Sequence, residues 1–388
     1  MRKRRFGSGP ARASKAAGLL LSCVLLTSCW DEVIIQDLLY VTAMGVEYDA
    51  KTGQYEVYGH LIDVTKVAKK EEGGGSGKNV SFVGHASGPS PYSALYNLYR
   101  TMQMEPNLDH LMTLVVGESS LPKLKDILDG INRSRAVRYT VNLMGTSDAM
   151  AKLFQSSEIV SKSPLNTNIY QPDSNPTNKP FDSPWDLQRM TRSFSHCACT
   201  AFIPRLDSVA AWESSSKKPS LPRFNGAYVL AEQRYKGMFT DDELAGARWF
   251  RGTAKSILVP LSQDGEFVGA LNVKKAKRSV KFVDSAGAPS FRLKLKADMT
   301  LIELLKSFPD RELEKLAESS IRQEIERTRK LSVSKDVDLF GLEETVFRYH
   351  PKRWKRLKTE GTEFAKLPVR VEVEVHLLHP GKRKLNQS

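Results

Sequence analysis

The run VRVEVEVHL, residues 369–377, places an aliphatic side chain at every odd position and a polar one between. Successive side chains of a strand point to opposite faces of a sheet, so this run predicts a strand with one buried and one solvated face. Such a pattern is typical of an antiparallel sheet that is covered on one side. Upstream, residues 310–331 repeat apolar side chains at helical spacing, with charged residues on the other face. The end of the chain therefore predicts a sheet covered by a helix.

The N-terminal half also alternates strand and helix patterns. Residues 41–48 and 55–62 are β-rich and flank a polar turn that ends in glycine, which predicts a hairpin. Apolar residues recur at helical spacing in 91–104 and 124–131, with a short apolar strand at 112–116 between them. The fold class that we expect is α+β, with mixed or antiparallel sheets covered by helices.

The first 28 residues have the layout of a signal peptide: six basic residues and no acid precede thirteen uncharged residues, 16–28. Thirteen helical residues rise about 20 Å, short of the ~30 Å hydrocarbon core, so a permanent membrane span is not expected. Leu26-Thr27-Ser28-Cys29 matches a lipobox, in which the thiol takes up diacylglycerol. We expect lipidation at Cys29, the first residue of the mature chain. The alternative is a plain secretory signal.

The formal charge of +14 includes the six signal-peptide cations, which leaves +8 for the mature chain. That moderate excess suits an anionic membrane surface, and we expect no nucleic-acid partner. Two basic runs, 274–278 and 352–358, carry much of the charge. Both are candidates for contact with headgroups or an acidic partner, and Trp354 among the cations suits an interface. The alternative is that both runs are solvated faces.

The expected domain organisation follows from composition. Residues 214–220, SSSKKPS, are typical of a linker, and the 360 residues of the mature chain suggest more than one domain. Residues 161–193 contain five prolines and little periodicity, so we expect a long surface loop there. The expected segments are a signal peptide (1–28), an N-terminal α/β domain (30–205), a linker (206–222), a middle domain (223–275) and a C-terminal α+β domain (276–388).

No catalytic pattern is found in the sequence. After Cys29 the only cysteines are Cys197 and Cys199, which are either half a metal site, a strained disulfide, or small buried hydrophobes in an extended segment, 194–203. Tetrahedral zinc needs four ligands and no second cysteine pair exists, so we favour the buried hydrophobes. His110, between two leucines, is expected to be structural. We expect no catalytic, cofactor-binding or metal-binding residues, and no enzyme.

Several stretches form an ordered set along the chain. They are Cys29-Trp30-Asp31, residues 41–46 (VTAMGV), 109–118 (DHLMTLVVGE), Arg138, 224–230 (FNGAYVL), 237–246 (GMFTDDELAG), 336–341 (DVDLFG), 350–355 (HPKRWK) and 369–377. Together they resemble the Ger(x)C family, the lipoprotein C subunits of bacterial spore germinant receptors.

The resemblance implies a mixed α/β protein of three domains, anchored by lipid to the outer face of the spore inner (cytoplasmic) membrane. It also implies polytopic A and B subunits as partners in sensing the nutrients that trigger germination, without enzymatic activity. The alternative is a solute-binding lipoprotein of a membrane transporter, although such proteins usually consist of lobes with recurrent βαβ units. An envelope hydrolase would need a nucleophile or metal cluster that the sequence does not show.

Overall fold

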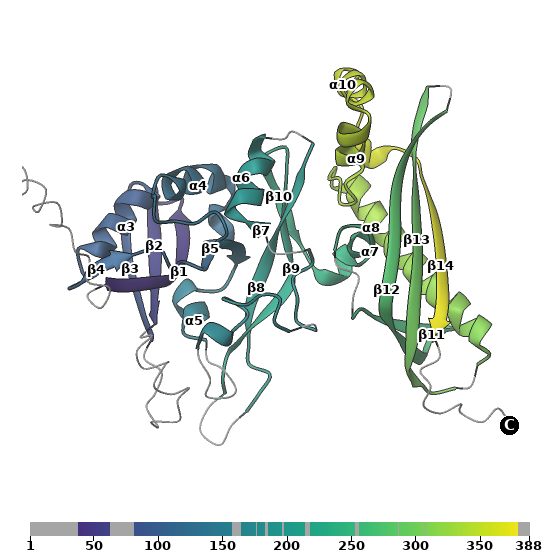
Figure 1. Ribbon diagram of the computed structural model, residues 1–388, viewed down its shortest axis with the longest axis horizontal. Helices are drawn as coiled ribbons and strands as arrows, with labels where there is room; N and C mark the ends of the chain where they lie inside the picture. Colours follow the sequence, from purple (N-terminus) through teal and green to yellow (C-terminus); the bar gives the residue numbers. More distant parts are fainter. Residues whose placement is uncertain are drawn as a thin grey trace, which may run out of the picture.

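The computed structural model describes residues 38–62, 81–156, 164–175, 177–182, 185–195, 198–213, 218–252, 256–285, 287–306 and 308–378. These residues form two bodies, each built on its own sheet, which follow one another along the chain and lie side by side (Figure 1). We call the described part of 38–239 the N-terminal lobe and that of 240–378 the C-terminal lobe. Both lobes combine sheets and helices, which confirms the predicted α+β class.

Ten described strands form one mixed sheet in the N-terminal lobe. They are β1 (Leu38–Asp49), β2 (Gln54–Ile62), β3 (Ser81–Gly88), β4 (Glu105–Asn107), β5 (Thr113–Gly117), β6 (Asn142–Thr146), β7 (Trp185–Asp186), β8 (Thr200–Val209), β9 (Leu221–Ala231) and β10 (Arg234–Phe239). Their order is β10-β9-β8-β6-β5-β1-β2-β3, with β4 beside β1 and β7 beside β6. The central strands β1, β5, β6 and β8 are parallel, and the flanks are antiparallel. The predicted β1–β2 hairpin is confirmed.

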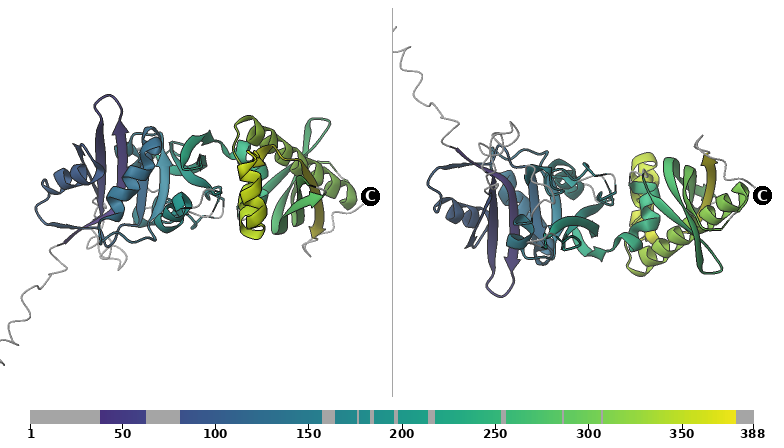
Figure 2. Two further views of the ribbon diagram at one scale, coloured as in Figure 1. Left: turned by 90° about the horizontal axis from the view of Figure 1, so that it is seen from above. Right: turned by 90° about the horizontal axis from the view of Figure 1, so that it is seen from below.

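Helices cover both faces of this sheet (Figures 1 and 2). Three of them, α3 (Pro91–Tyr99), α4 (Leu124–Asn132) and α6 (Leu187–Ser195), pack on one face, whereas α5 (Met150–Phe154) packs on the other. Two short 3₁₀ helices, η2 (Glu118–Lys123) and η3 (Pro164–Asn166), complete the lobe.

The predicted surface loop at 161–193 is wrong in part: much of 171–182 is irregular and exposed, but other described residues of the segment are buried, and α6 begins at Leu187. Ile169 and Tyr170 are buried in the core on one face of the sheet, and Trp185 is buried on the other. The segment shows no period because each apolar side chain fills its own gap rather than lining a face.

The C-terminal lobe contains a four-stranded sheet with a long helix across its inner face. The strands are β11 (Leu258–Gln263), β12 (Glu266–Ser285), β13 (Ala288–Leu304) and β14 (Val369–Leu378), in that order. The helices are α7 (Asp241–Arg251), α8 (Asp310–Ser334), α9 (Leu342–Tyr349), α10 (Pro351–Thr359) and the 3₁₀ helix η4 (Phe364–Lys366). The predicted apolar face of α8 is confirmed, because Leu313, Ala317, Ile321 and Ile325 are buried.

The direction of β14 differs from the expectation. β14 is strictly alternating, yet it pairs parallel to β13, whereas β11, β12 and β13 are antiparallel to one another. Alternation arises because α8 covers only the inner face of the sheet. The direction is set by the connection: α8, α9 and α10 return the chain to the end of the sheet at which β13 begins, as parallel pairing requires.

The free edge of β14 is closed by side chains of α8. The Arg322 guanidinium donates to two strand carbonyl oxygens at 3.2 Å each, and Glu318 and Glu314 accept from two strand N–H groups at 3.2 and 2.9 Å. The strand residues, in that order, are Val371, Val373, Val375 and Leu377. The three helix residues are spaced four apart and so share one side of α8. Their contacts satisfy backbone groups that an edge strand otherwise leaves unpaired.

The start of α7 is tied to the N-terminal sheet. The sequence TDDE at 240–243 predicts a capping box, and Thr240 and Glu243 form it. The Asp241 carboxylate accepts from the N–H of Gly226 on β9 at 3.0 Å. Gly226 has φ +83°, and a Cβ there would collide with the Phe239 carbonyl oxygen, so only glycine fits this contact.

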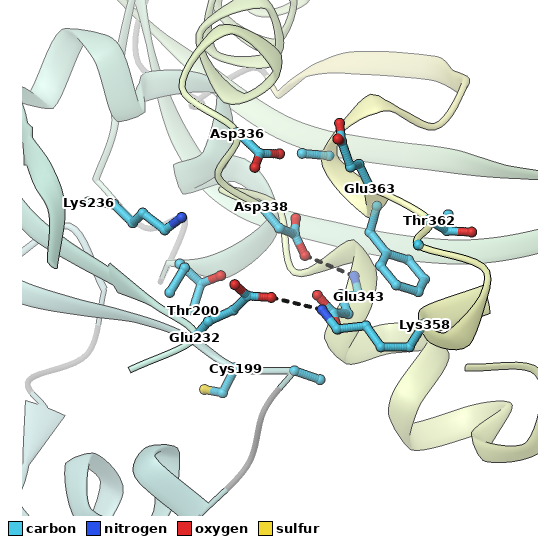
Figure 3. A pocket seen from close by; sticks show the side chains of 15 residues that line it. Cys199, Thr200, Glu232, Lys236, Asp336, Asp338, Glu343, Lys358, Thr362 and Glu363 are labelled. Carbon is cyan, nitrogen blue, oxygen red and sulfur yellow. Dashed lines mark hydrogen bonds and ion pairs between the residues drawn. The ribbon is translucent and has the colours of Figure 1, made fainter. Parts of the chain in front are cut away.

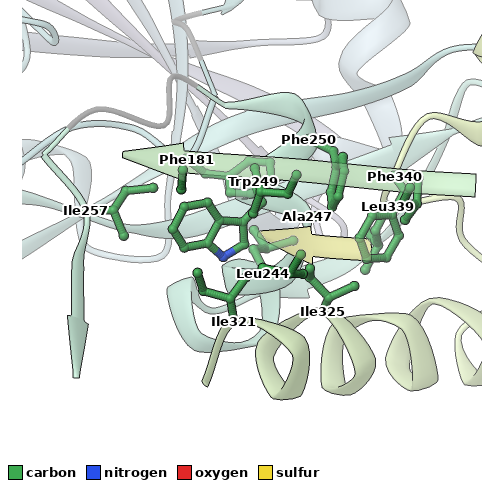
Figure 4. Packing of buried hydrophobic residues seen from close by; sticks show 14 of the residues in the cluster. Phe181, Leu244, Ala247, Trp249, Phe250, Ile257, Ile321, Ile325, Leu339 and Phe340 are labelled. Atoms are coloured by element: carbon green, nitrogen blue, oxygen red, sulfur yellow. The ribbon is translucent and has the colours of Figure 1, made fainter. Parts of the chain in front are cut away.

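Further along, α7 crosses α8 at very close range. A Cβ on Gly246 would lie 2.5 Å from the carbonyl oxygen of Glu324. The Gly246 N–H donates to the Thr328 hydroxyl oxygen at 3.0 Å, and that hydroxyl donates to the Glu243 carbonyl oxygen at 2.8 Å. Trp249 is buried beside the crossing (Figure 4), and its indole N–H donates to the Glu324 carboxylate at 2.8 Å. The crossing therefore fixes α7 in both position and rotation.

Two of the predicted domain boundaries fall within paired strands rather than between the two sheets. The predicted linker, 206–222, includes the paired ends of β8 and β9, where Leu206 faces Phe224 and Val209 faces Leu221. The boundary expected after residue 275 falls inside β12, because Ala276 and Val280 of the same strand pack on the core. Polar and basic composition predicts breaks at both places, but strand pairing continues through them. The division into three domains stays a prediction.

The α7–α8 crossing yields a test. Gly246→Ala should lower the free energy of unfolding by about 3 kcal/mol, because the added methyl overlaps backbone that cannot move without separating the helices. The measurement is urea unfolding followed by tryptophan fluorescence. The control is Gly130→Ala in α4, where the new Cβ meets Pro91 at an ordinary 3.5 Å and should raise stability by up to ~1 kcal/mol. Similar effects of the two substitutions would contradict the close crossing.

Candidate functional site at the lobe junction

A polar cavity of about 230 Å³ lies where the two lobes meet (Figure 3). The N-terminal lobe contributes the start of β8 and the β9–β10 turn, and the C-terminal lobe contributes the segments after α8 and α10. The polar side chains of the lining are Cys199, Thr200, Glu232, Lys236, Asp336, Asp338, Glu343, Lys358, Thr362 and Glu363. Because both lobes supply walls, any change in their relative position changes the cavity.

Lys358 connects the lobes across this cavity. Its Nζ lies 2.9 Å from the Glu232 carboxylate of the N-terminal lobe and 3.1 Å from the Glu343 carboxylate of α9. The Trp354 indole N–H donates to the same Glu343 oxygen at 3.0 Å. Burial acts to lower the pKa of Lys358, but the two carboxylates outweigh it and raise that pKa. The partner carboxyls differ: Lys358 lowers the pKa of Glu232, whereas burial raises the pKa of Glu343.

The β9–β10 turn that carries Glu232 is strained. Glu232 and Gln233 have φ of +51° and +64°, the left-handed region that hairpin turns usually fill with Asn and Gly. Each such residue costs on the order of 1 kcal/mol and persists where surrounding contacts hold it. The contacts here are the Glu232–Lys358 ion pair and a 2.7 Å hydrogen bond from the Gln233 amide to the Phe194 carbonyl oxygen. The turn is therefore held partly by the opposite lobe.

The segment between α8 and α9 shapes the facing wall. The Asp338 carboxylate accepts from the N–H groups of Phe340 and Glu343 at 3.2 and 2.8 Å. Gly341, with φ +73°, immediately precedes α9, and a Cβ there would lie 2.8 Å from the Arg251 guanidinium. The stretch 336–341, which carries part of the resemblance, thus orients α9 and Glu343 toward the cavity.

Arg251, at the end of α7, bridges the lobes on a second side. Its guanidinium donates to the Thr200 carbonyl oxygen at 3.0 Å and lies 3.2 Å from the Glu344 carboxylate. It also lies 4.9 Å from the centre of the Phe202 ring. The Arg251 side chain is only 9% exposed, so Glu344 compensates a charge that is largely withdrawn from water.

Removal of Arg251 should weaken the junction strongly. Arg251→Met should lower the free energy of unfolding by about 3 kcal/mol, because it breaks a buried pair and leaves Glu344 with one partner fewer. Arg348 pairs with the same carboxylate but is 65% exposed, so Arg348→Met is the matched control, with an expected loss below about 1 kcal/mol. Urea unfolding of the three chains measures both values. Equal losses would show that burial does not set the contribution of Arg251.

Of the three cysteines considered as candidate sites in the sequence, the structure describes only Cys199. Cys29 and Cys197 lie outside the described residues, and lipidation at Cys29 stays a prediction. Cys199 is a half-buried free thiol in the cavity wall, and burial, with the nearby Glu344 charge, raises its pKa. The expected extended segment 194–203 is a strand only from Thr200, because its first two residues end α6.

The other singled-out residues serve the protein's own packing. Trp354 is 9% exposed and packs edge to face on Phe347, so its predicted interfacial role is wrong. In the same basic run, Arg353 pairs with Asp284 at 2.6 Å. His110 is exposed, and its ring contacts Tyr40 at 4.6 Å.

His60 is a buried histidine that the sequence does not mark as a candidate site residue. Its Nδ1 hydrogen-bonds the Tyr170 hydroxyl, which lies 3.0 Å from the Thr42 hydroxyl. Its ring stacks on Phe154 at 5.5 Å, and its Nε2 has no hydrogen-bond partner among the described residues. Burial lowers the pKa of His60 to about 4. No local pattern marks His60, because its partners come from distant segments.

His60 makes stability depend on pH. A histidine in the unfolded chain has a pKa near 6.5 and is protonated below that pH. In the folded protein His60 stays neutral down to about pH 4, so between these values protonation stabilises only the unfolded state. Between pH 7 and 4 the wild type should lose about 3 kcal/mol from this group. His60→Leu, which leaves the Tyr170–Thr42 contact in place, should abolish that part of the loss in unfolding measured against pH. His110→Gln is the control, and an unchanged profile in His60→Leu would contradict the assignment.

Neither a metal centre nor a spanning helix is found in the described part of the chain. Within it, no group of three His, Cys, Asp or Glu side chains is placed to hold a metal ion. None of its helices is long and apolar enough to cross a bilayer.

The fold and the junction define a class of two-lobed α+β proteins in which α7 connects a mixed sheet to a smaller sheet. Residues 31–208 match the family described as spore germination protein N-terminal domain. Residues 225–381 match the family described as spore germination B3/GerAC like, C-terminal. The chain belongs to the Ger(x)C family of spore germination proteins.

The relatives span almost the whole chain. Spore germination protein KC of Bacillus subtilis (strain 168) is 22% identical over 396 residues, which cover 94% of this chain and 95% of the relative. The putative spore germination protein YfkR of the same organism is 21% identical over 371 residues, 92% and 93% of the two chains. The crystal structure of the GerBC protein superposes with a TM-score of 0.56 at 16% identity and covers 87% of this chain and 98% of that chain. This structural likeness shows the fold.

Proposed function

We propose that the chain is the lipid-anchored C subunit of a spore germinant receptor and acts with polytopic A and B subunits in nutrient-triggered germination. Residues 1–28 are its signal peptide, and Cys29 carries the diacylglyceryl anchor. The protein sits on the outer face of the spore inner membrane and works by binding, not by catalysis. The observation that carries the proposal is the ordered match of both family halves, over residues 31–208 and 225–381.

The lobe junction supports a role in protein assembly. Lys358 and Arg251 bridge the lobes at two separate points, and the strained Glu232–Gln233 turn depends on one of these bridges. An interface of this kind holds the relative position of the lobes, which a partner subunit would contact as one surface. A lipid anchor would confine that surface to two dimensions and raise its effective concentration near membrane partners.

Lipidation is tested by metabolic labelling with palmitate in the native host. The wild type should take up label and fractionate with membranes, because two acyl chains anchor stably where one does not. Cys29→Ala should lose both label and membrane retention after signal processing. Cys23→Ala, which removes the neighbouring signal-peptide cysteine, is the matched control and should behave as the wild type. Label in Cys29→Ala would exclude this anchor.

The receptor role is tested in spores that lack the gene. Such spores should stop responding to a particular nutrient and regain the response when the wild-type gene is restored. The A and B subunits should co-purify with the tagged wild-type chain from detergent-solubilised spore membranes. Normal germination toward every tested nutrient in a strain that also lacks paralogous receptors would contradict the proposal.

A further inference from the structure

The outer face of the C-terminal sheet, opposite α8, is basic. The strands β12, β13 and β14 align their outward side chains in cross-strand rows, such as Lys277 beside Lys296 beside Glu374. Inward neighbours such as Leu295 are buried in the core. Seven cations and three carboxylates occupy these rows together with Ser279 and His376, and we call the ten charged residues the basic face. They are Lys275, Lys277, Lys281, Arg292, Lys294, Lys296, Arg370, Asp298, Glu372 and Glu374.

The carboxylates do not balance the cations of the basic face. Glu372 forms ion pairs with Arg292, Lys294 and Arg370 at 3.4–3.8 Å. Glu374 forms ion pairs with Lys294, at 3.0 Å, and with Lys296. The remaining basic side chains are exposed and form no ion pair with a described residue: Lys275, Lys277 and Lys281. By contrast, α8 on the other side of the lobe carries six acidic and six basic residues. Of the sheet and the helix that covers it, the outer side of the sheet therefore carries the excess positive charge.

A row with an exposed leucine at each end borders the basic face. Leu258, Asn272, Thr300 and Leu378 form one row across all four strands. Leu258 is 58% exposed and Leu378 is 37% exposed, and Ile302, at a bulge beside this row, is 57% exposed. The outer side of the sheet thus combines unpaired cations with exposed aliphatic side chains along one margin.

This composition fits a lipid surface better than a protein partner. Protein interfaces are depleted in lysine and enriched in Tyr, Trp and Phe at their centre, whereas the basic face is rich in lysine and its rows contain no Tyr, Trp or Phe. Lysine stems lie along apolar surface while the ammonium groups reach phosphates. Basic clusters of four to eight residues are typical of sites for anionic lipids.

We propose that the basic face is a second membrane-contact site, which binds anionic phospholipid headgroups and places Leu258, Ile302 and Leu378 at the lipid interface. The site lies in the lobe remote in sequence from Cys29, so anchor and basic face together would restrain both lobes at the membrane. The proposal takes the presence of a membrane from the proposed function, but the contact is measurable without the anchor.

The test uses the mature chain, residues 29–388, with Cys29→Ala, which cannot be acylated, and measures its co-sedimentation with vesicles. Binding should be stronger to equal amounts of phosphatidylglycerol and phosphatidylcholine than to phosphatidylcholine alone, and should fall with added salt. Lys277→Gln with Lys281→Gln should weaken binding about 25-fold, because each basic residue near an anionic surface contributes about fivefold. The matched control is Lys315→Gln with Lys330→Gln on α8, which removes the same charge from exposed positions and should change binding less than about twofold. Circular dichroism checks that all chains are folded.

Three outcomes would overturn the lipid assignment. Equal losses in the two double variants would show that only net charge matters, and equal binding to both vesicle types would show no headgroup contact. The third outcome is protection of Lys277 and Lys281 from acetylation in spore membranes but not on the anionic vesicles, which would assign the face to an acidic protein. Failure of any kind leaves the Cys29 proposal untouched, because the tested chain lacks that cysteine.

Discussion

The close crossing of α7 and α8 at Gly246 positions most of the C-terminal half of the molecule. Because no side chain separates the helices there, a single backbone contact sets the spacing between the connecting helix and the helix that covers the second sheet. α7 is tied at its start to Gly226 of β9, so the same contact places the second sheet relative to the first. Arg251 lies at the end of α7, and its bridge between the lobes depends on this placement.

The sequence predicts those parts of the fold that local chemistry determines. The β1–β2 hairpin and the Thr240 capping box are confirmed, because turn residues and caps act within a few positions. The antiparallel pairing expected for β14 is wrong, because alternation indicates only which faces are covered, whereas the helical connection sets the direction. Trp185 was not predicted as a core residue, because an aperiodic segment gives no sign of which side chain fills a gap.

The contacts at the lobe junction could not be predicted from the sequence, for a related reason. Lys358 and Glu232 are 126 residues apart, and no spacing rule connects them. The basic run at 274–278 is misleading as a linear patch, since strand alternation turns Lys275 and Lys277 outward while Arg278 donates to the Gly252 carbonyl oxygen. The family resemblance identifies stretches such as 237–246 but not what they do. The physical role of each, such as that of Gly246 at the α7–α8 crossing, is visible only in three dimensions.

The closed edge of β14 limits how copies of this chain can associate. A strand from a neighbouring molecule would have to displace Arg322, Glu318 and Glu314 before it found a free backbone group on that edge. At this edge, molecules are thus hindered from joining sheet to sheet, the route by which exposed edges lead to open-ended polymers. What remains for recognition on this side of the lobe is side-chain chemistry, which can be specific to one partner, rather than backbone pairing, which any extended chain can satisfy.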